Sequence, residues 1–115
     1  MVDLDHLERV LVRAARDRRP VTYGQLLAFF ERKVTRITVG ALCRDLGIVC
    51  RRMEAKGAPD LACLVVRKSD GLPGEGWFTA EREASGYAGP STGPEAERCV
   101  RLRQERAYRH FAEDR

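Results

Sequence analysis

The stretch LACLVVRKSDGLPGEGWF, residues 61–78, decides how the rest of the sequence is interpreted. Residues 61–68 are rich in β-branched and apolar side chains and predict a strand, and the Ser-Asp-Gly sequence at 69–71 is typical of a tight turn. Residues 74–78 then predict a return strand. Pro73 must lie at an edge or in the loop, because it has no N–H to donate to a ladder. The stretch therefore predicts a β-hairpin.

Three helices are predicted before this hairpin. Asp3 can cap a helix over residues 3–17, in which apolar residues recur at helical spacing. Thr22 and Gln25 match a capping box, which predicts a second helix that ends near position 33. A threonine at position 35 or 38 can cap a third helix, whose apolar residues repeat every three or four positions as far as position 56.

The segments after the hairpin predict a loop and one more helix. Residues 79–93 are rich in Gly, Ser and Pro, whereas Pro94 and the acids that follow it are typical of a helix start. The expected order is helix, helix, helix, hairpin, helix. This order predicts an α+β winged helix over residues 1–78, with an additional C-terminal helix over residues 94–115 packed on the same domain. The length of 115 residues fits one domain.

Positive charge is concentrated in the middle of the sequence. The chain has a net charge of +4, but residues 32–68 carry nine bases and three acids, whereas residues 79–115 carry seven of each. A polyanion would therefore be attracted to the central third. No apolar run is long enough to span a bilayer and no signal-peptide core follows Met1, so we expect a cytoplasmic protein without membrane contact.

The cysteines and glycines of the sequence are interpreted as structural. No C-x-x-C pair occurs and the two histidines lie at opposite ends of the chain, so neither a metal site nor another cofactor is expected. Cys43 and Cys50 fall on the apolar face of the third helix and are expected to be buried thiols. Gly40 and Gly47 on the same helix predict close packing against a neighbouring element, since glycine otherwise weakens a helix.

The winged-helix interpretation places candidate contact residues on two elements. In such a fold the third helix can enter the major groove of DNA, while the wing touches the flanking backbone. The bases expected on the exposed side of the third helix and at the tip of the hairpin are Arg44, Arg51, Arg52, Lys56, Arg67 and Lys68.

Three short motifs resemble one protein family. Residues 21–26 (VTYGQL) resemble the V-x-T/S-Y-G-Q-L stretch in the DNA-binding domain of alkylguanine-DNA alkyltransferases and alkyltransferase-like proteins. Residues 39–42 (VGAL) are similar to the family's A-V-G-x-A-L/M, and residues 65–71 (VVRKSDG) resemble the R-V-V-x-x-x-G that opens its wing. The resemblance covers residues 20 to 78. It implies a contact of Tyr23 with a nucleotide phosphate, and an arginine inserted into the duplex from a position that is Ile37 here, with Arg36 beside it.

The same resemblance lacks the catalytic group of the family. A P-C-H-R motif precedes the paired valines there, and its cysteine accepts the alkyl group. Here Ala62 stands at that cysteine's position. Cys63 is one residue away, and a one-residue slip in a strand turns a side chain to the opposite face. With no partner histidine to lower a thiol pKa, we expect no alkyl transfer and no enzymatic activity.

Two functional hypotheses remain open from the sequence. The first is a non-enzymatic protein that binds duplex DNA through the third helix and the wing. The second is a small protein-interaction module, an inhibitor or adaptor that docks on a larger protein, for instance one encoded by a mobile element. The sequence does not decide between a monomer and a homodimer. It also leaves open whether Trp77 and Phe78 belong to the core or to a contact surface.

Overall fold

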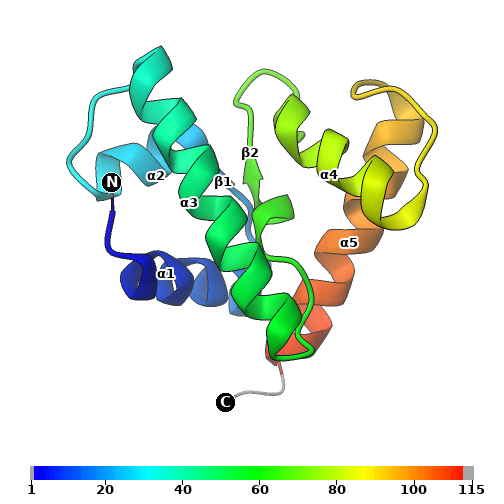
Figure 1. The fold of residues 1–115 in the computed structure, drawn as a ribbon, viewed down its shortest axis with the longest axis horizontal. Coiled ribbons are helices and arrows are strands. Elements are labelled where there is room, and N and C mark those ends of the chain that lie inside the picture. The colour runs from blue at the N-terminus through cyan, green and yellow to red at the C-terminus, as the bar shows by residue number, and fades with distance from the viewer. Residues whose placement is uncertain (1, 113–115) are drawn as a thin grey trace.

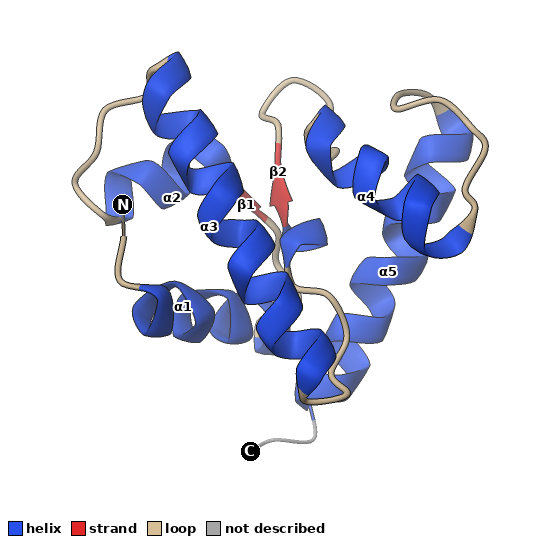
Figure 2. Cartoon of the chain, viewed as in Figure 1, coloured by secondary structure: helices blue, strands red, loops and turns tan. Residues whose placement is uncertain are grey.

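The computed structural model describes residues 2–112 of the chain. Helices make up most of the fold, and two very short strands lie at its centre (Figures 1 and 2). Helix α3 crosses in front of the strands, α1 lies at the lower left, and α4 and α5 form the right-hand side (Figure 1). The main core is built from buried leucines and valines of α1, α2, α3 and the central strand region, together with Ala107, Tyr108 and Phe111 of α5.

Local hydrogen bonds begin the first three helices where the sequence predicts them. Helix α1 (Leu4–Arg16) starts at Asp3, whose carboxylate accepts from the backbone N–H groups of the next turn. Helix α2 (Tyr23–Phe29) starts with the expected capping box of Thr22 and Gln25. Helix α3 (Arg36–Ala55) is capped by Thr35, which forms a second capping box with Thr38. These predicted helix starts are confirmed, although α2 ends at Phe29 and not near position 33.

The predicted hairpin is wrong, and with it the winged-helix fold. Strand β2 (Val65–Val66) pairs in parallel with β1 (Val21–Thr22), a segment far away in the chain, so that Val21 lies opposite Val65. A single turn of 3-10 helix, η1 (Ala62–Leu64), precedes β2 in place of the first half of the expected strand. The turn after β2 is closed by the N–H of Arg67 donating to the carbonyl of Leu72, at 2.8 Å.

Helix α4 (Glu75–Ser85) occupies the place of the predicted return strand. Its first turns bury Phe78 completely against Leu72 and two residues of α5. Residues 80–84 (AEREA) are good helix formers and continue the helix to Gly86, which ends it at a φ of 74°. The loop that was expected over residues 79–93 therefore begins only at Gly86.

Helix α5 (Pro94–Ala112) packs along α1 and η1. The one amide side chain buried in this described helix, that of Gln104, donates from Nε2 to the carbonyl of Cys63 at 3.0 Å and so attaches α5 to η1. The helix was expected to reach residue 115, and residues 113–115 lie outside the described part of the chain. Between residues 2 and 112, no helix combines the length and the apolar character that crossing a membrane requires.

Replacing Gln104 by alanine is expected to lower the free energy of unfolding by about 1–3 kcal/mol, because the buried carbonyl of Cys63 loses its donor. Leu102→Ala on the same helix serves as the control. Leu102 is 56% exposed, so its truncation should change stability by no more than about 0.5 kcal/mol. Urea unfolding followed by circular dichroism measures both changes, and equal effects would contradict this role for Gln104.

Candidate functional site

Helix α3 presents its charged residues to two different environments. Its buried face is formed by Leu42, Leu46, Val49 and Met53. On the side toward α1, the guanidinium of Arg52 lies 2.8 Å from a carboxylate oxygen of Asp5, and the ammonium of Lys56 lies 3.1 Å from one of Glu8. Arg52 and Lys56 were both predicted as contact residues, and the structure places them in ion pairs between two helices.

The outward side of α3 carries the arginine stripe, which we define as Arg36, Arg44 and Arg51. At 3.6 residues per turn, the three positions lie within about 80° of one another around the helix axis. All three side chains are exposed, and within residues 2–112 none of them makes an ion pair. The structure therefore brings together three of the predicted residues as uncompensated positive charges.

The two glycines of α3 lie beneath this stripe. A Cβ at Gly40 would stand 3.9 Å from Nη1 of Arg44, and one at Gly47 would stand 3.7 Å from Nη1 of Arg51. No neighbouring element comes within 4 Å of either position, so the prediction of close helix packing at these glycines is wrong. Because glycine has no side chain, the helix surface is shallow at these two positions, and the side chains of Arg44 and Arg51 lie along it. Ile37, in the first turn, is 81% exposed next to the stripe.

The remaining predicted residues belong to other elements than the arginine stripe, although Tyr23 lines the same pocket as Arg51. Arg67 pairs with Asp70 at 3.0 Å and also donates to the carbonyl of Ser91, so it closes the turn after β2. Lys68 is exposed in that turn. The hydroxyl of Tyr23 accepts from the backbone N–H of Gly74 at 3.0 Å, and burial raises its pKa. Tyr23 thus anchors the start of α4.

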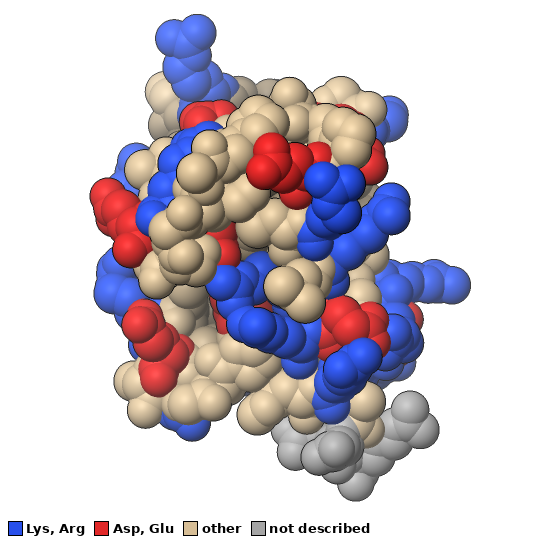
Figure 3. Space-filling view, turned by 90° about the vertical axis from the view of Figure 1, so that its right-hand side faces the viewer, with Lys and Arg blue, Asp and Glu red and all other residues tan. Residues whose placement is uncertain are grey.

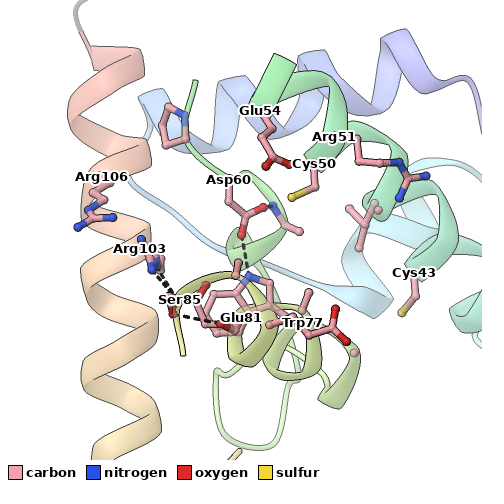
Figure 4. A pocket seen from close by; sticks show the side chains of 18 of the residues that line it. Cys43, Cys50, Arg51, Glu54, Asp60, Trp77, Glu81, Ser85, Arg103 and Arg106 are labelled. Carbon is pink, nitrogen blue, oxygen red and sulfur yellow. Dashed lines mark hydrogen bonds and ion pairs between the residues drawn. The ribbon is translucent and has the colours of Figure 1, made fainter. Parts of the chain in front are cut away.

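A cleft of about 740 Å³ opens beside the arginine stripe, between α3 and α4, with α5 at one end (Figure 4). Cys43, Gly47, Cys50 and Glu54 line its α3 wall at successive turns, and the half-buried indole of Trp77 lies on the α4 side. The sequence predicted no cleft, because its walls come from segments that meet only in the folded chain. The one signal was the pair of glycines on α3, which were interpreted from the sequence as a site of close helix packing and of which Gly47 lines the cleft.

The Asp60 carboxylate holds the bottom of the cleft together. One of its oxygens accepts from the indole Nε1 of Trp77 at 2.7 Å, and the other accepts from the backbone N–H of Ala62 at 2.7 Å (Figure 4). At the α5 end, the guanidinium of Arg103 binds Glu81 at 2.6 Å, and Ser85 donates to the same carboxylate. Helix α4 is therefore attached at both ends of the cleft by charge-assisted hydrogen bonds.

The thiols in and below the cleft are not activated as nucleophiles. Burial, reinforced by the nearby Asp60 carboxylate, raises the pKa of Cys50 to about 12. Cys63 is fully buried, and its pKa is raised well above the usual range by the same two causes. Burial also raises the pKa of Cys43, which is exposed and not buried as predicted. Ala62 also lines the cleft, with a methyl group.

No family model, curated protein or solved structure gave a significant match to this chain. In the part of the chain described by the structure, no three His, Cys, Asp or Glu side chains are grouped so that they could hold a metal ion. The cleft and the arginine stripe together offer apolar surface, one indole face, the positive charge of the stripe and acidic side chains on the cleft walls, among them Glu54 and Glu83.

The environments of the thiols predict an order of labelling by a disulfide reagent in the native state. At pH 8, Cys43 should react first because it is exposed. Cys50 should react more slowly, because burial raises its pKa to about 12 and keeps the thiol protonated at this pH. Cys63 should react only on unfolding. Peptide mapping by mass spectrometry at several times measures the order, and rapid native labelling of Cys63 would restore a nucleophilic role for it.

Proposed function

We propose that this protein binds duplex DNA, without catalysing a reaction, through the arginine stripe of α3. The observation that carries the proposal is the contrast within one helix. Arg36, Arg44 and Arg51 have no ion-pair partner among the described residues, whereas Arg52 and Lys56 are paired with acids of α1. A guanidinium fork that is free of carboxylates is available for the oxygens of a phosphate.

The dimensions of α3 suit a duplex. With a rise of 1.5 Å per residue, Arg36 and Arg51 are separated by about 22 Å along the axis, roughly two thirds of a turn of B-DNA. Gly40 and Gly47 keep the helix surface low between the arginines, which permits a phosphate backbone to approach closely. The resemblance to alkyltransferase-like DNA-binding domains supports the same ligand. The predicted hairpin wing has no part in the proposal.

Binding through three phosphate contacts predicts a defined salt dependence. A plot of the logarithm of the binding constant against the logarithm of salt concentration should have a slope of about −2.7, since each contact contributes about −0.9. Arg51→Gln should reduce the slope to about −1.8. Arg52→Gln, on the same helix and with the same change of charge, should leave it unchanged because its guanidinium is held by α1. Fluorescence anisotropy with a short labelled duplex measures all three slopes.

Two results would contradict DNA binding by the arginine stripe. If the wild-type protein does not bind duplex even at low salt, the proposal fails, and docking on a partner protein becomes the better interpretation. If Arg51→Gln and Arg52→Gln weaken binding equally, positive charge in general is responsible and the stripe is not. Thermal unfolding of both variants separates loss of binding from loss of fold. Each side chain is at least one third exposed, so neither substitution should cost more than about 1 kcal/mol.

We also propose that the cleft receives an unstacked base from the bound duplex. The supporting observation is the indole of Trp77, which lines a cleft directly beside the arginine stripe and is held in place by Asp60. Aromatic side chains stack on bases with little regard to sequence, and a mismatched base is the least costly to take out of a duplex.

The single tryptophan makes this second proposal measurable. Emission from Trp77 should be quenched more strongly by a mismatched duplex than by a fully paired one of the same length, because only an unstacked base reaches the indole. Arg51→Gln should reduce the quenching by both duplexes, and the mismatched duplex should still quench more strongly than the paired one. Equal quenching by the two duplexes, at saturation of the protein, would contradict insertion of a base.

A further inference from the structure

A second group of arginines lies where the end of α1 meets the middle of α5. The guanidinium of Arg18 is 2.7 Å from a carboxylate oxygen of Glu105 and stacks over the ring of Tyr108, 5.0 Å from its centroid. Arg109 binds the same carboxylate at 3.2 Å. One negative charge is thus shared by two positive ones, which leaves the neighbourhood of Glu105 with a surplus of positive charge.

Two more arginines extend this group along α5. Arg101 and Arg98 precede Glu105 by four and seven residues, so both lie on the same side of the helix as Glu105. Both are exposed, and neither makes an ion pair within residues 2–112. In Figure 3, Lys and Arg side chains cover more of the side of the molecule that carries α5 than Asp and Glu do. We define the α5 arginine surface as Arg18, Arg98, Arg101 and Arg109.

The composition of this surface fits a phosphate backbone better than a protein. Protein interfaces are enriched in arginine, but together with aromatic side chains and methionine and around a centre depleted of charge. Here Leu102 is the only large apolar side chain of the described helix that is strongly exposed, and arginines stand directly before and after it in the sequence. Arginine forks match phosphate oxygens in geometry and charge. From Arg98 to Arg109 the surface extends about 16 Å along the helix, enough for several phosphates.

The α5 arginine surface lies on a different side of the molecule from the arginine stripe. Arg103 and Arg106 line the cleft and therefore mark the flank of α5 that faces α3. The opposite flank of α5 faces the end of α1. There Arg18, a member of the α5 arginine surface, binds Glu105. The protein measures 35 × 34 × 23 Å, and DNA is stiff over such lengths. A straight duplex bound along α3 therefore does not reach the α5 arginine surface.

We infer that the α5 arginine surface binds the backbone of a second duplex, so that one molecule of this protein holds two DNA segments together. The inference rests on the proposed binding of DNA by α3. It adds a partner for a surface that the first contact leaves unused, and it requires no second protein chain.

The test is a bridging experiment with two duplexes of the same sequence, one immobilised on beads and one labelled in solution. Wild-type protein should recruit the labelled duplex to the beads. The variant Arg98→Gln/Arg101→Gln should bind the immobilised duplex as wild type does but recruit roughly tenfold less labelled duplex, because two phosphate contacts are lost. The matched control is Arg9→Gln/Lys33→Gln, which removes two exposed bases that make no ion pair within residues 2–112 and lie outside the arginine stripe, the cleft and the α5 arginine surface, so it should recruit normally.

The outcomes separate the two proposals. Recruitment that is lost only in Arg98→Gln/Arg101→Gln supports the inference. If wild-type protein binds the beads but recruits no second duplex, the inference is overturned and DNA binding by α3 stands. If wild-type protein does not bind the beads at all, the proposed function itself fails. If Arg98→Gln/Arg101→Gln recruits as much as wild type, bridging occurs through self-association, and the assignment to α5 is overturned.

Discussion

The Asp60 carboxylate accepts one hydrogen bond from the indole of Trp77 and one from the backbone of Ala62, and so holds α4 across from α3. Hydrogen bonds to a charged group each contribute about 1.5–3 kcal/mol when they are partly buried. This carboxylate joins the connection after α3, the η1 turn and the start of α4 at one point. Together with the buried Phe78 and the Arg103–Glu81 pair, Asp60 fixes α4 as the second wall of the cleft. The position of Trp77 also depends on it.

The ion pairs of α3 contribute little to stability. Their larger effect is to neutralise positive charges that would otherwise be available at the surface. Exposed pairs contribute about 0–1 kcal/mol each. Their effect is to bind Arg52 and Lys56 to the acids of α1, whereas Arg51, one residue away, points about 100° around the helix into solvent. Ion pairing distinguishes the arginines of α5 in the same way, because Arg103 is bound to Glu81 whereas Arg101 has no such partner among the described residues. Charge available to a ligand is therefore a property of helix packing.

The starts of the helices could be predicted because they depend on neighbouring residues. The hydroxyls of Thr22 and Thr35 accept from N–H groups three residues ahead, and a motif of this length can be recognised in any sequence. The hairpin prediction was wrong because strand β2 finds its partner in β1, and no pattern within residues 61–78 contains that information. Residues 80–84 did contain a helix signal, and the glycines and prolines that follow them obscured it.

The sequence by itself determined where α1, α2, α3 and α5 begin, that α3 has an apolar side, and that the middle of the chain is basic. Only the tertiary structure decided which α3 residues face α1, which face the cleft and which face solvent. In the folded chain, α3 is oriented so that Asp45 and Val49 are buried and Cys43 is exposed. The physical reason is the distance along the sequence between the residues that interact. Capping and helical periodicity are satisfied within one or two turns, whereas the cleft and both arginine groups arise from contacts between segments far apart in the chain.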